Sequence, residues 1–281
     1  DRSEIMLQQT QVKTVIPFFN AFIKKFPNLK SISKASEDEI LALWTGLGFY
    51  RRAKNIFKTK EIIKNEFKNR FPKKFEELIL LPGIGRSTAG AIMSIAYNKS
   101  YPILDANVKR VISRYENIDI EQKNVIKSLW ELSETFTPSE NIFEYTQGIM
   151  DLGATICNLR SPKCSICPLN ISCKSAFKEF ETVKKTKKQK LTKRINFTLA
   201  HSNQSFLLFK KNEQSFWESL WTPYDNQHLN SKSIFKDPKK VQTRRLNHAL
   251  SHLDLDITVE IFDYDKPFKI ETNLEHQWIN K

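Results

Sequence analysis

All four cysteines of the 281-residue chain lie within one short segment. Cys157, Cys164, Cys167 and Cys173 follow the spacing C-x6-C-x2-C-x5-C, with a proline directly after the third cysteine. Soft thiolates grouped in this way bind zinc or iron–sulfur clusters. A structural zinc site more often has two close cysteine pairs far apart in sequence, and disulfides are rare in a reducing compartment. The spacing therefore indicates a metal centre, with structural zinc and a disulfide as the alternatives.

A glycine-rich turn is the second feature that could do chemistry. Leu80-Leu81-Pro82-Gly83-Ile84-Gly85 joins two apolar segments, and a helix is predicted to begin near Arg86-Ser87-Thr88. Glycine permits a positive φ and a close backbone approach. The free N–H groups at a helix start bind phosphate without reading base sequence. Gly83, Gly85 and Ser87 are therefore candidates for binding a phosphate, although such a turn by itself is more often an ordinary connection between helices.

An aspartate follows this turn in a similar setting. Asp105 stands twenty residues after Gly85, between the apolar run Pro102-Ile103-Leu104 and the segment Ala106-Asn107-Val108. This order predicts an aspartate at the start of a helix, where the helix dipole keeps the carboxylate ionised. Most such residues only cap their helix, so the position alone does not separate a capping role from a catalytic one.

The elements that position these residues are predicted to be helices as far as about Lys174. Apolar residues recur there at spacings of three and four, and breaks at prolines and glycines divide the region into about eight helices. The breaks are Pro27, Gly46–Gly48, Pro72, Pro82–Gly85 and Pro102.

The pattern changes after Cys173. A basic tract, Lys174–Arg194, is followed by alternating segments that predict strands at Ile195–His201, Gln204–Lys210 and Leu253–Phe262. We therefore predict a mainly α domain over residues 1–175, a basic linker over 176–194 and a small α+β domain over 195–281.

The formal net charge of the chain is +14. This surplus favours a polyanionic partner, because each Lys or Arg beside a phosphate releases condensed counterions. A solvated lysine-rich surface is the plain alternative, and charge alone does not decide between the two. A membrane partner is not expected, since the sequence has neither a long apolar run nor a basic amphipathic helix.

The cysteine spacing together with the Pro-Gly-x-Gly turn resembles the helix-hairpin-helix DNA glycosylases that carry a 4Fe–4S cluster, such as endonuclease III and MutY. Within that superfamily, the opening Ser3-Glu4-Ile5-Met6-Leu7-Gln8-Gln9-Thr10-Gln11-Val12 is similar to the MutY-type adenine DNA glycosylases nearly residue for residue. The resemblance implies a helix-hairpin-helix glycosylase fold, one 4Fe–4S cluster on the four cysteines, and a loop whose Arg160 and Lys163 face the DNA backbone.

The resemblance also implies catalytic roles. Glu4 becomes the general acid that protonates adenine, Asp105 stabilises the oxocarbenium-like sugar, and Asn107 orients Asp105. Burial would have to keep Glu4 protonated, so the two carboxyl groups are expected to differ in pKa. The segment Gly85-Arg86-Ser87-Thr88 lacks the Schiff-base lysine of the bifunctional members, so water is the expected nucleophile.

Further residues are implied to bind the DNA. Leu7 and Val12 would line the adenine pocket, Gln9 would fill the base stack, and Gln8 and Thr10 belong to the same segment. Leu43–Arg52 resembles the family segment that wedges into the duplex. Phe49 and Tyr50 are its wedge residues, and Phe49 stands where the family usually has tyrosine.

The C-terminal region resembles the Nudix-like domain that checks for 8-oxoguanine. By this resemblance Ser251 and His252 contact the oxidised guanine, while Leu250 replaces the usual phenylalanine. The sequence lacks the array of glutamates that binds magnesium in active Nudix hydrolases, so pyrophosphatase activity is not expected. We also expect the chain to be shorter than the family at both ends.

The implied substrate is duplex DNA with an A:8-oxoguanine or A:G mispair, bound by a monomer in a bacterial-type cytoplasm. Two rival hypotheses remain at this point: a bifunctional glycosylase for pyrimidine lesions, and an iron–sulfur DNA-binding module without catalysis.

Overall fold

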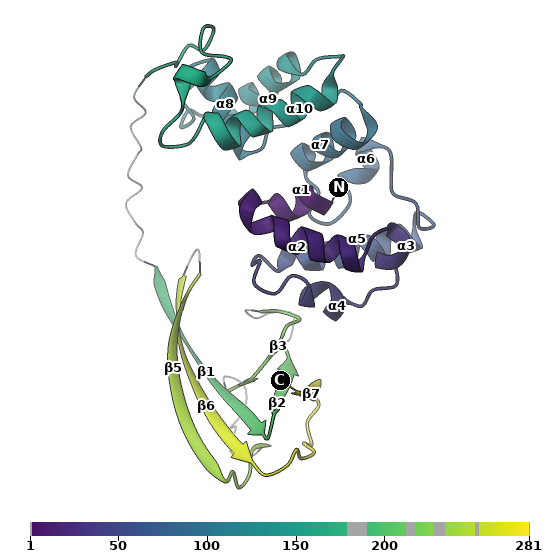
Figure 1. Cartoon of the computed structure of the whole chain (residues 1–281), viewed down its shortest axis with the longest axis vertical. Coiled ribbons are helices and arrows are strands. Elements are labelled where there is room, and N and C mark those ends of the chain that lie inside the picture. Colours follow the sequence, from purple (N-terminus) through teal and green to yellow (C-terminus); the bar gives the residue numbers. More distant parts are fainter. Residues whose placement is uncertain (1, 179–189, 212–216, 227–233, 251–252, 281) are drawn as a thin grey trace. The chain divides into compact units, whose positions relative to one another are not determined.

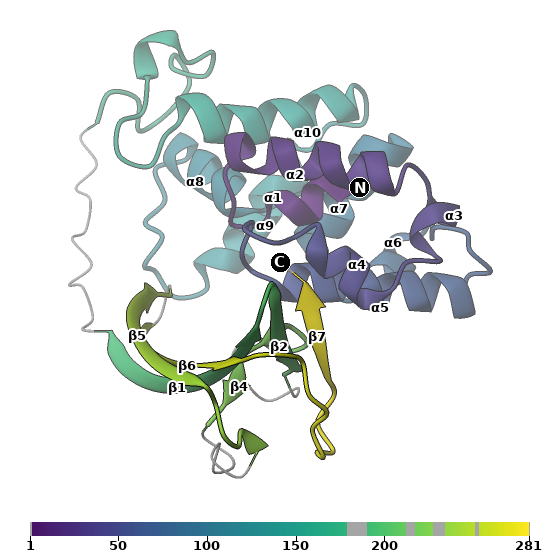
Figure 2. The same cartoon turned by 60° about the horizontal axis from the view of Figure 1, so that its bottom comes forward.

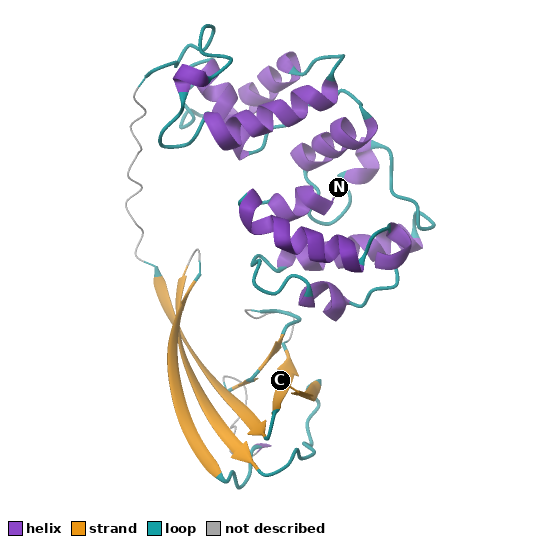
Figure 3. Ribbon diagram, viewed as in Figure 1, coloured by secondary structure: helices purple, strands orange, loops and turns teal. Residues whose placement is uncertain are grey.

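The fold is described from a computed structural model of the whole chain (Figure 1). The structure describes residues 2–178, 190–211, 217–226, 234–250 and 253–280. The chain divides into two compact units, Asp1–Thr182 and Val183–Lys281. Nearly all of the described helices belong to the first unit and the strands to the second (Figure 3). The described part of the chain contains no helix that is long and apolar enough to cross a membrane.

The first unit contains ten described α-helices and a π-helix at Leu152–Ile156. The α-helices are α1 (Arg2–Leu7), α2 (Val12–Lys25), α3 (Leu29–Ile32), α4 (Glu37–Ala42), α5 (Arg51–Asn65), α6 (Phe75–Leu78), α7 (Arg86–Tyr97), α8 (Ala106–Tyr115), α9 (Val125–Phe136) and α10 (Ile142–Asp151). Each break predicted at a proline or glycine falls between two of them. The prediction of about eight helices was low because α3 and α6 have only four residues each, too few to show an apolar period.

Several helix starts follow from local sequence. At α4, the Glu39 amide donates to the Ser36 hydroxyl and the Ser36 amide donates to the Glu39 carboxylate, which forms a capping box. At α8, the N-cap is Asp105. At the other end of a helix, Asn98 closes α7 in the left-handed conformation that asparagine tolerates. These caps satisfy backbone groups that the helices leave free.

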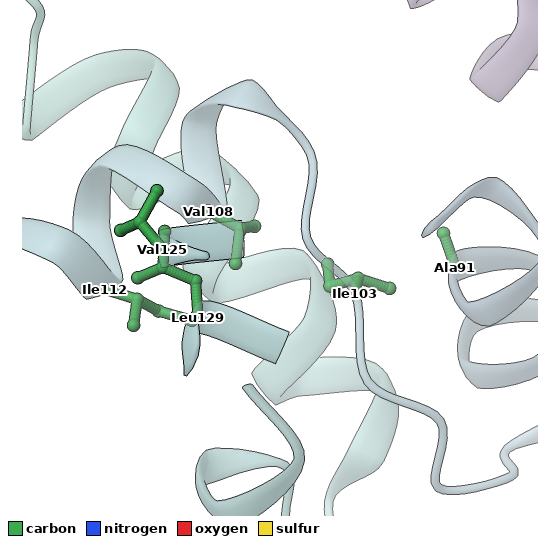
Figure 4. Close-up of a cluster of buried hydrophobic side chains, with 6 residues drawn as sticks. All are labelled: Ala91, Ile103, Val108, Ile112, Val125 and Leu129. Carbon is green, nitrogen blue, oxygen red and sulfur yellow. The ribbon is translucent and has the colours of Figure 1, made fainter. Parts of the chain in front are cut away.

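A buried cluster holds the start of α8 in place (Figure 4). Ile103, on the segment between α7 and α8, is 2% exposed and lies between Ala91 of α7 and a group from α8 and α9. That group is Val108, Ile112, Val125 and Leu129. Burying each aliphatic side chain contributes about 1.5–3 kcal/mol. Gly90 allows the close approach, since a Cβ there would lie 2.5 Å from the Pro102 carbonyl oxygen.

The second unit is built on a mixed sheet whose described strands have the order β3-β2-β1-β6-β5, with β4 paired to β1 and β7 to β2. The strands are β1 (Leu191–Ser202), β2 (Ser205–Lys210), β3 (Trp221–Thr222), β4 (Tyr224–Asp225), β5 (Lys240–Ala249), β6 (Leu253–Tyr264) and β7 (His276–Asn280). β1 and β6 run parallel in the register Ile195↔Ile257, and the other pairs are antiparallel. β1, β6 and β5 curve together as long neighbouring strands (Figure 2).

Three sequence expectations for this unit need correction or qualification. Residues 191–194, assigned to the basic linker, belong to β1, where pairing with β6 overrides their polar character. β5 was not predicted as a strand, because nearly all its residues are exposed and show no apolar alternation. Apart from the single helical residue Ile234, the regular elements described in this unit are strands, so the helical part of the α+β prediction is not seen among them.

Candidate functional site

Asp105 is the last residue of the segment between α7 and α8 and is the N-cap of α8. Its Oδ1 accepts a hydrogen bond from the Val108 amide at 2.7 Å. The neighbouring Leu104 amide donates to the Ser87 hydroxyl at 3.0 Å, which ties this segment to the first turn of α7. Asp105 therefore caps α8. Its position is fixed by the hydrogen bond to α7 on one side and by the buried cluster around Ile103 on the other.

Glu4 lies on α1, which packs against α2 and α7. The two residues that follow it, Ile5 and Met6, belong to the buried core. Burial raises the pKa of the Glu4 carboxyl above its ordinary value, and the charge of Asp105 raises this pKa further. The structure thus brings the two predicted carboxyl groups within electrostatic reach of each other, in surroundings that favour a protonated Glu4.

The segment after α1 turns back onto the hairpin. The side-chain amide of Gln8 donates to the Gly83 carbonyl at 3.2 Å and to the Thr88 hydroxyl at 3.4 Å. Gln9 is exposed and has a φ of +57°. Of the other candidates, Leu7 and Thr10 are half-buried, whereas Val12 is 56% exposed at the start of α2. Gln8 therefore links the end of α1 to the hairpin turn.

The hairpin turn itself requires glycine at one of its two positions. Gly83 has a φ of +82°, and a Cβ there would lie 2.5 Å from the Asn55 amide nitrogen. Gly85 is the N-cap of α7 with a φ of −91°, and nothing lies within 4 Å of where its Cβ would be. Both residues are exposed, at the end of α7 that carries its free N–H groups.

The proposed wedge segment is a tight turn between α4 and α5. Gly46 and Gly48 have φ values of +93° and +77°. Phe49 is 49% exposed with a φ of +49°. The Tyr50 hydroxyl accepts from the Gly46 amide at 3.4 Å, and the indole nitrogen of the fully buried Trp44 donates to the Gly48 carbonyl at 3.0 Å. The turn is thus held from inside while Phe49 faces outward.

The four cysteines meet at one cavity, which Arg114 also lines. None of the four forms a disulfide, and all are half-buried. Burial raises the pKa of the Cys173 thiol, and the three other thiols add to the rise. Within the described residues, no three His, Cys, Asp or Glu side chains are close enough to hold a single metal ion.

Two arginines of α8 connect this cysteine loop to the helix that Asp105 caps. The Arg110 guanidinium donates to the Asn107 side-chain oxygen at 2.9 Å, to the Gly153 carbonyl and to the Cys157 carbonyl at 2.8 Å. One turn later, Arg114 donates to the Cys157 sulfur at 3.5 Å. No hydrogen bond joins Asn107 to Asp105 among the described residues, so no direct contact supports the orienting role expected of Asn107.

Arg110, Arg114 and Gly153 were not among the predicted site residues. The two arginines stand at i and i+4 on one helix face, a spacing that could have indicated a common target. A Cβ added at Gly153 would lie 2.7 Å from the Asn107 Cβ, so glycine allows these two segments to pack closely. No local sequence pattern reveals this contact.

A basic hollow lies beside the cysteines. Arg160 and Lys163, the two residues expected to face phosphates, line the same open cavity of about 530 Å³, together with Phe177 and Lys178. The two remaining candidates, Ser251 and His252, lie outside the described residues. In sequence they fall between β5 and β6, and the Leu250 amide donates to the Leu253 carbonyl at 2.8 Å.

The chain is similar to known DNA repair proteins. Residues 2–135 match the HhH-GPD superfamily of base excision DNA repair proteins. Adenine DNA glycosylase of Buchnera aphidicola subsp. Schizaphis graminum (strain Sg) is 44% identical over 270 residues, covering 91% of this chain and 77% of that protein. The human adenine DNA glycosylase is 38% identical over 176 residues, or 62% of this chain and 32% of that protein.

Solved structures are similar over the helical part. A thermostable thymine-DNA glycosylase is 31% identical with a TM-score of 0.55, covering 62% of this chain and 81% of that one. Endonuclease III in a non-covalent DNA complex is 22% identical, covers 61% of this chain and 80% of that one, and has a TM-score of 0.54, which supports the fold alone. The chain belongs to the adenine DNA glycosylases, enzymes of the helix-hairpin-helix superfamily that act in base excision repair by hydrolysing N-glycosidic bonds.

Proposed function

We propose that this enzyme removes adenine paired with 8-oxoguanine or guanine from duplex DNA, by hydrolysis and without cutting the strand. The observation that carries the proposal is the pairing of two unlike carboxyl groups. Glu4 has a raised pKa because it is buried, while Asp105 is the N-cap of α8, with one oxygen held by the Val108 amide. A raised pKa suits a proton donor, and a fixed carboxylate suits the stabilisation of developing positive charge.

Glu4 is the proton donor in this mechanism. Adenine leaves poorly as an anion, so a proton must reach its ring as the bond to the sugar breaks. Raising the pKa of a carboxyl group favours the protonated form that this step requires. The base must be flipped out of the stack to reach it, at a cost of a few kcal/mol that contacts to the phosphates and the wedge turn offset.

Asp105 stabilises the sugar as positive charge develops. Its Oδ1 accepts from the Val108 amide, and its Oδ2 has no hydrogen bond among the described residues. The second oxygen is therefore available to the sugar while the first fixes the carboxylate. A preorganised charge of this kind acts without reorganisation during the reaction.

Water completes the reaction because the hairpin offers no amine. Ser87 occupies the place of the Schiff-base lysine, and its hydroxyl accepts from the Leu104 amide. The adjacent Arg86 has its guanidinium 3.9 Å from the Trp130 ring centroid and pairs with Glu134. A guanidinium does not deprotonate at neutral pH and forms no Schiff base, so a strand-cutting lyase step is disfavoured.

The cysteine cavity fits a 4Fe–4S cluster. A single zinc ion needs all its sulfur ligands about 2.3 Å from one centre, whereas each cysteine of a cluster binds a different iron. Four soft thiolates that line one cavity are the donor set that such a cluster takes. Cys157, Cys164, Cys167 and Cys173 would hold the cluster, which supplies a rigid core for the loop that carries Arg160 and Lys163. No step of base removal passes through it.

The second unit is assigned the recognition of the base opposite adenine. Its mixed sheet and the resemblance of residues 250–252 support a Nudix-like domain with Ser251 and His252 at the lesion. The exposed β5 strand, which includes Arg244 and Arg245, adds positive charge to this unit.

The test is base release under single-turnover conditions from duplexes that differ only in the base opposite adenine. We expect adenine release opposite 8-oxoguanine and guanine, none opposite thymine, strand breaks only after alkali, and no borohydride-trapped complex. Trapping or β-elimination products would instead indicate a bifunctional enzyme. Tight binding of the mispair without base release would indicate a DNA-binding module.

A further inference from the structure

Arg52, in the first turn of α5, is a buried arginine that no proposed catalytic step uses. Its side chain is 6% exposed, and its two terminal nitrogens donate to backbone carbonyls. Nη1 donates to Ile5 at 3.3 Å, to Met6 and to Gln8 at 2.7 Å. Nη2 donates to Gly48 at 3.2 Å. One guanidinium thus joins two segments that lie at least forty residues apart in sequence.

The first of these segments is the C-terminal end of the helix that carries Glu4. α1 has only six residues, so its last carbonyls have no partners within the helix. A cation at a helix C-terminus both satisfies such carbonyls and complements the negative end of the dipole. Ile5 and Met6 directly follow Glu4 in sequence, so these hydrogen bonds fix the backbone next to the proton donor.

The second segment is the turn that presents Phe49. The Arg52 guanidinium carbon lies 5.3 Å from the centroid of the Phe49 ring and 5.4 Å from that of Trp44. The Gly48 carbonyl that accepts from Nη2 also accepts from the Trp44 indole. Phe49 keeps a φ of +49°, which a phenylalanine rarely adopts unless its surroundings impose it.

The contact also extends to the hairpin. Gln8, whose carbonyl accepts from Arg52, donates through its side chain to the Gly83 carbonyl and the Thr88 hydroxyl. The proton-donor helix, the wedge turn and the hairpin are therefore all within two hydrogen bonds of one side chain. None of the contacts described for Arg52 is to a carboxylate, so carbonyl dipoles and aromatic faces balance its charge.

We propose that Arg52 is a positioning residue that sets the proton-donor helix and the wedge turn in one fixed geometry, so that Glu4 is placed correctly when Phe49 enters the duplex. This inference rests on the roles proposed above for Glu4 and Phe49. A planar guanidinium reaches both segments at once, because its N–H donors point in different directions within one plane. A lysine ammonium is a single point and cannot span them.

The test compares Arg52→Lys with Arg51→Lys. Arg51 precedes Arg52 on the same helix turn but is exposed, so the control makes the same chemical change outside the contact network. Adenine release is measured under single-turnover conditions, duplex affinity by titration, and backbone protection by hydrogen exchange. We expect Arg52→Lys to slow release by about 10- to 100-fold, since a misplacement of about 1 Å can cost about 100-fold. Duplex affinity should change less than about threefold, because the positive charge is kept.

Hydrogen exchange gives a result that does not depend on activity. Arg52→Lys should raise exchange in residues 4–10 and 46–50 only, and Arg51→Lys should leave both segments unchanged. If the wild-type protein releases no adenine, the proposed function fails, while this comparison still decides whether Arg52 fixes the two segments. Unchanged exchange and unchanged release in Arg52→Lys would overturn the inference.

A second variant covers the case in which Arg52→Lys does not fold. Arg52→Met leaves no buried charge and still fills the space beside the two rings. A folded Arg52→Met protein with slowed release, and with raised exchange in the same two segments, supports positioning. Unfolding of both variants, shown by melting curves against Arg51→Lys, would mean that Arg52 serves the core as a whole and would overturn it as well.

Discussion

Substituting Asp105 by asparagine separates its role as the N-cap of α8 from the catalytic role proposed for it. As an N-cap, it accepts the Val108 amide through one oxygen at 2.7 Å. Asparagine caps helices about as well as aspartate, so Asp105→Asn should change the free energy of unfolding by less than about 1 kcal/mol, the size of a lost charge–dipole interaction. Asp105→Ala, which removes the cap, should cost about 1 kcal/mol or somewhat more.

The catalytic role predicts a much larger effect on the same substitution. Removing one preorganised group that stabilises developing charge costs about 100- to 1000-fold in rate, or about 2.7–4 kcal/mol. Loss of a full negative charge beside the sugar should be at least this large. Asp105→Asn should therefore keep its fold and its affinity for the duplex, and lose adenine release.

The assay pairs single-turnover adenine release with chemical denaturation. Asp119→Asn is the matched control, because Asp119 also accepts a local backbone hydrogen bond, from the Glu121 amide at 2.9 Å, in an exposed loop away from the site. Release by Asp105→Asn within tenfold of wild type would refute the reasoning. If Asp105→Asn lost adenine release only in proportion to its loss of folded protein, Asp105 would act only as an N-cap.

Three other perturbations follow from the same geometry. Burial raises the pKa of Glu4, so its contribution to stability is complete below the unfolded value of about 4.3 and is lost as pH rises through the raised folded value; Glu4→Gln should remove this loss, seen by denaturation across pH 4–8, and should abolish base release at every pH, because glutamine cannot deliver the proton. Gly83→Ala places a Cβ 2.5 Å from the Asn55 amide at a φ of +82°, so duplex affinity should fall at least about tenfold, while Gly85→Ala, with open space around it, should change affinity much less. Removing iron with a chelator under reducing conditions should lower both the melting temperature and the duplex affinity, and equal values for the two forms would contradict a structural cluster.

The helical part of the fold was predictable because its signals are local. Prolines and glycines mark the breaks between helices, and the apolar residues of α2, α4 and α5 recur with the helical period. Glu4, Asp105 and the cysteines could be singled out as candidates because family motifs surround them in sequence.

Arg52 and Arg110 could not be found in this way, because their roles depend on contacts to segments more than forty residues distant. Each side chain donates to backbone carbonyls, which every residue type possesses, so the partners leave no trace in sequence. β5 was missed for a different reason. Its pairing with β6 comes from backbone hydrogen bonds along an exposed strand, with no apolar alternation to reveal it.

The central claim is that Glu4 and Asp105 act on opposite sides of the bond between adenine and its deoxyribose. A crystal structure of the Asp105→Asn protein bound to a duplex with adenine opposite 8-oxoguanine tests this claim most directly. We expect the adenine to be flipped out, with the Glu4 carboxyl in hydrogen-bond contact with a ring nitrogen and residue 105 beside the sugar. An adenine that enters the protein elsewhere, with Glu4 turned away from the base, would contradict the account.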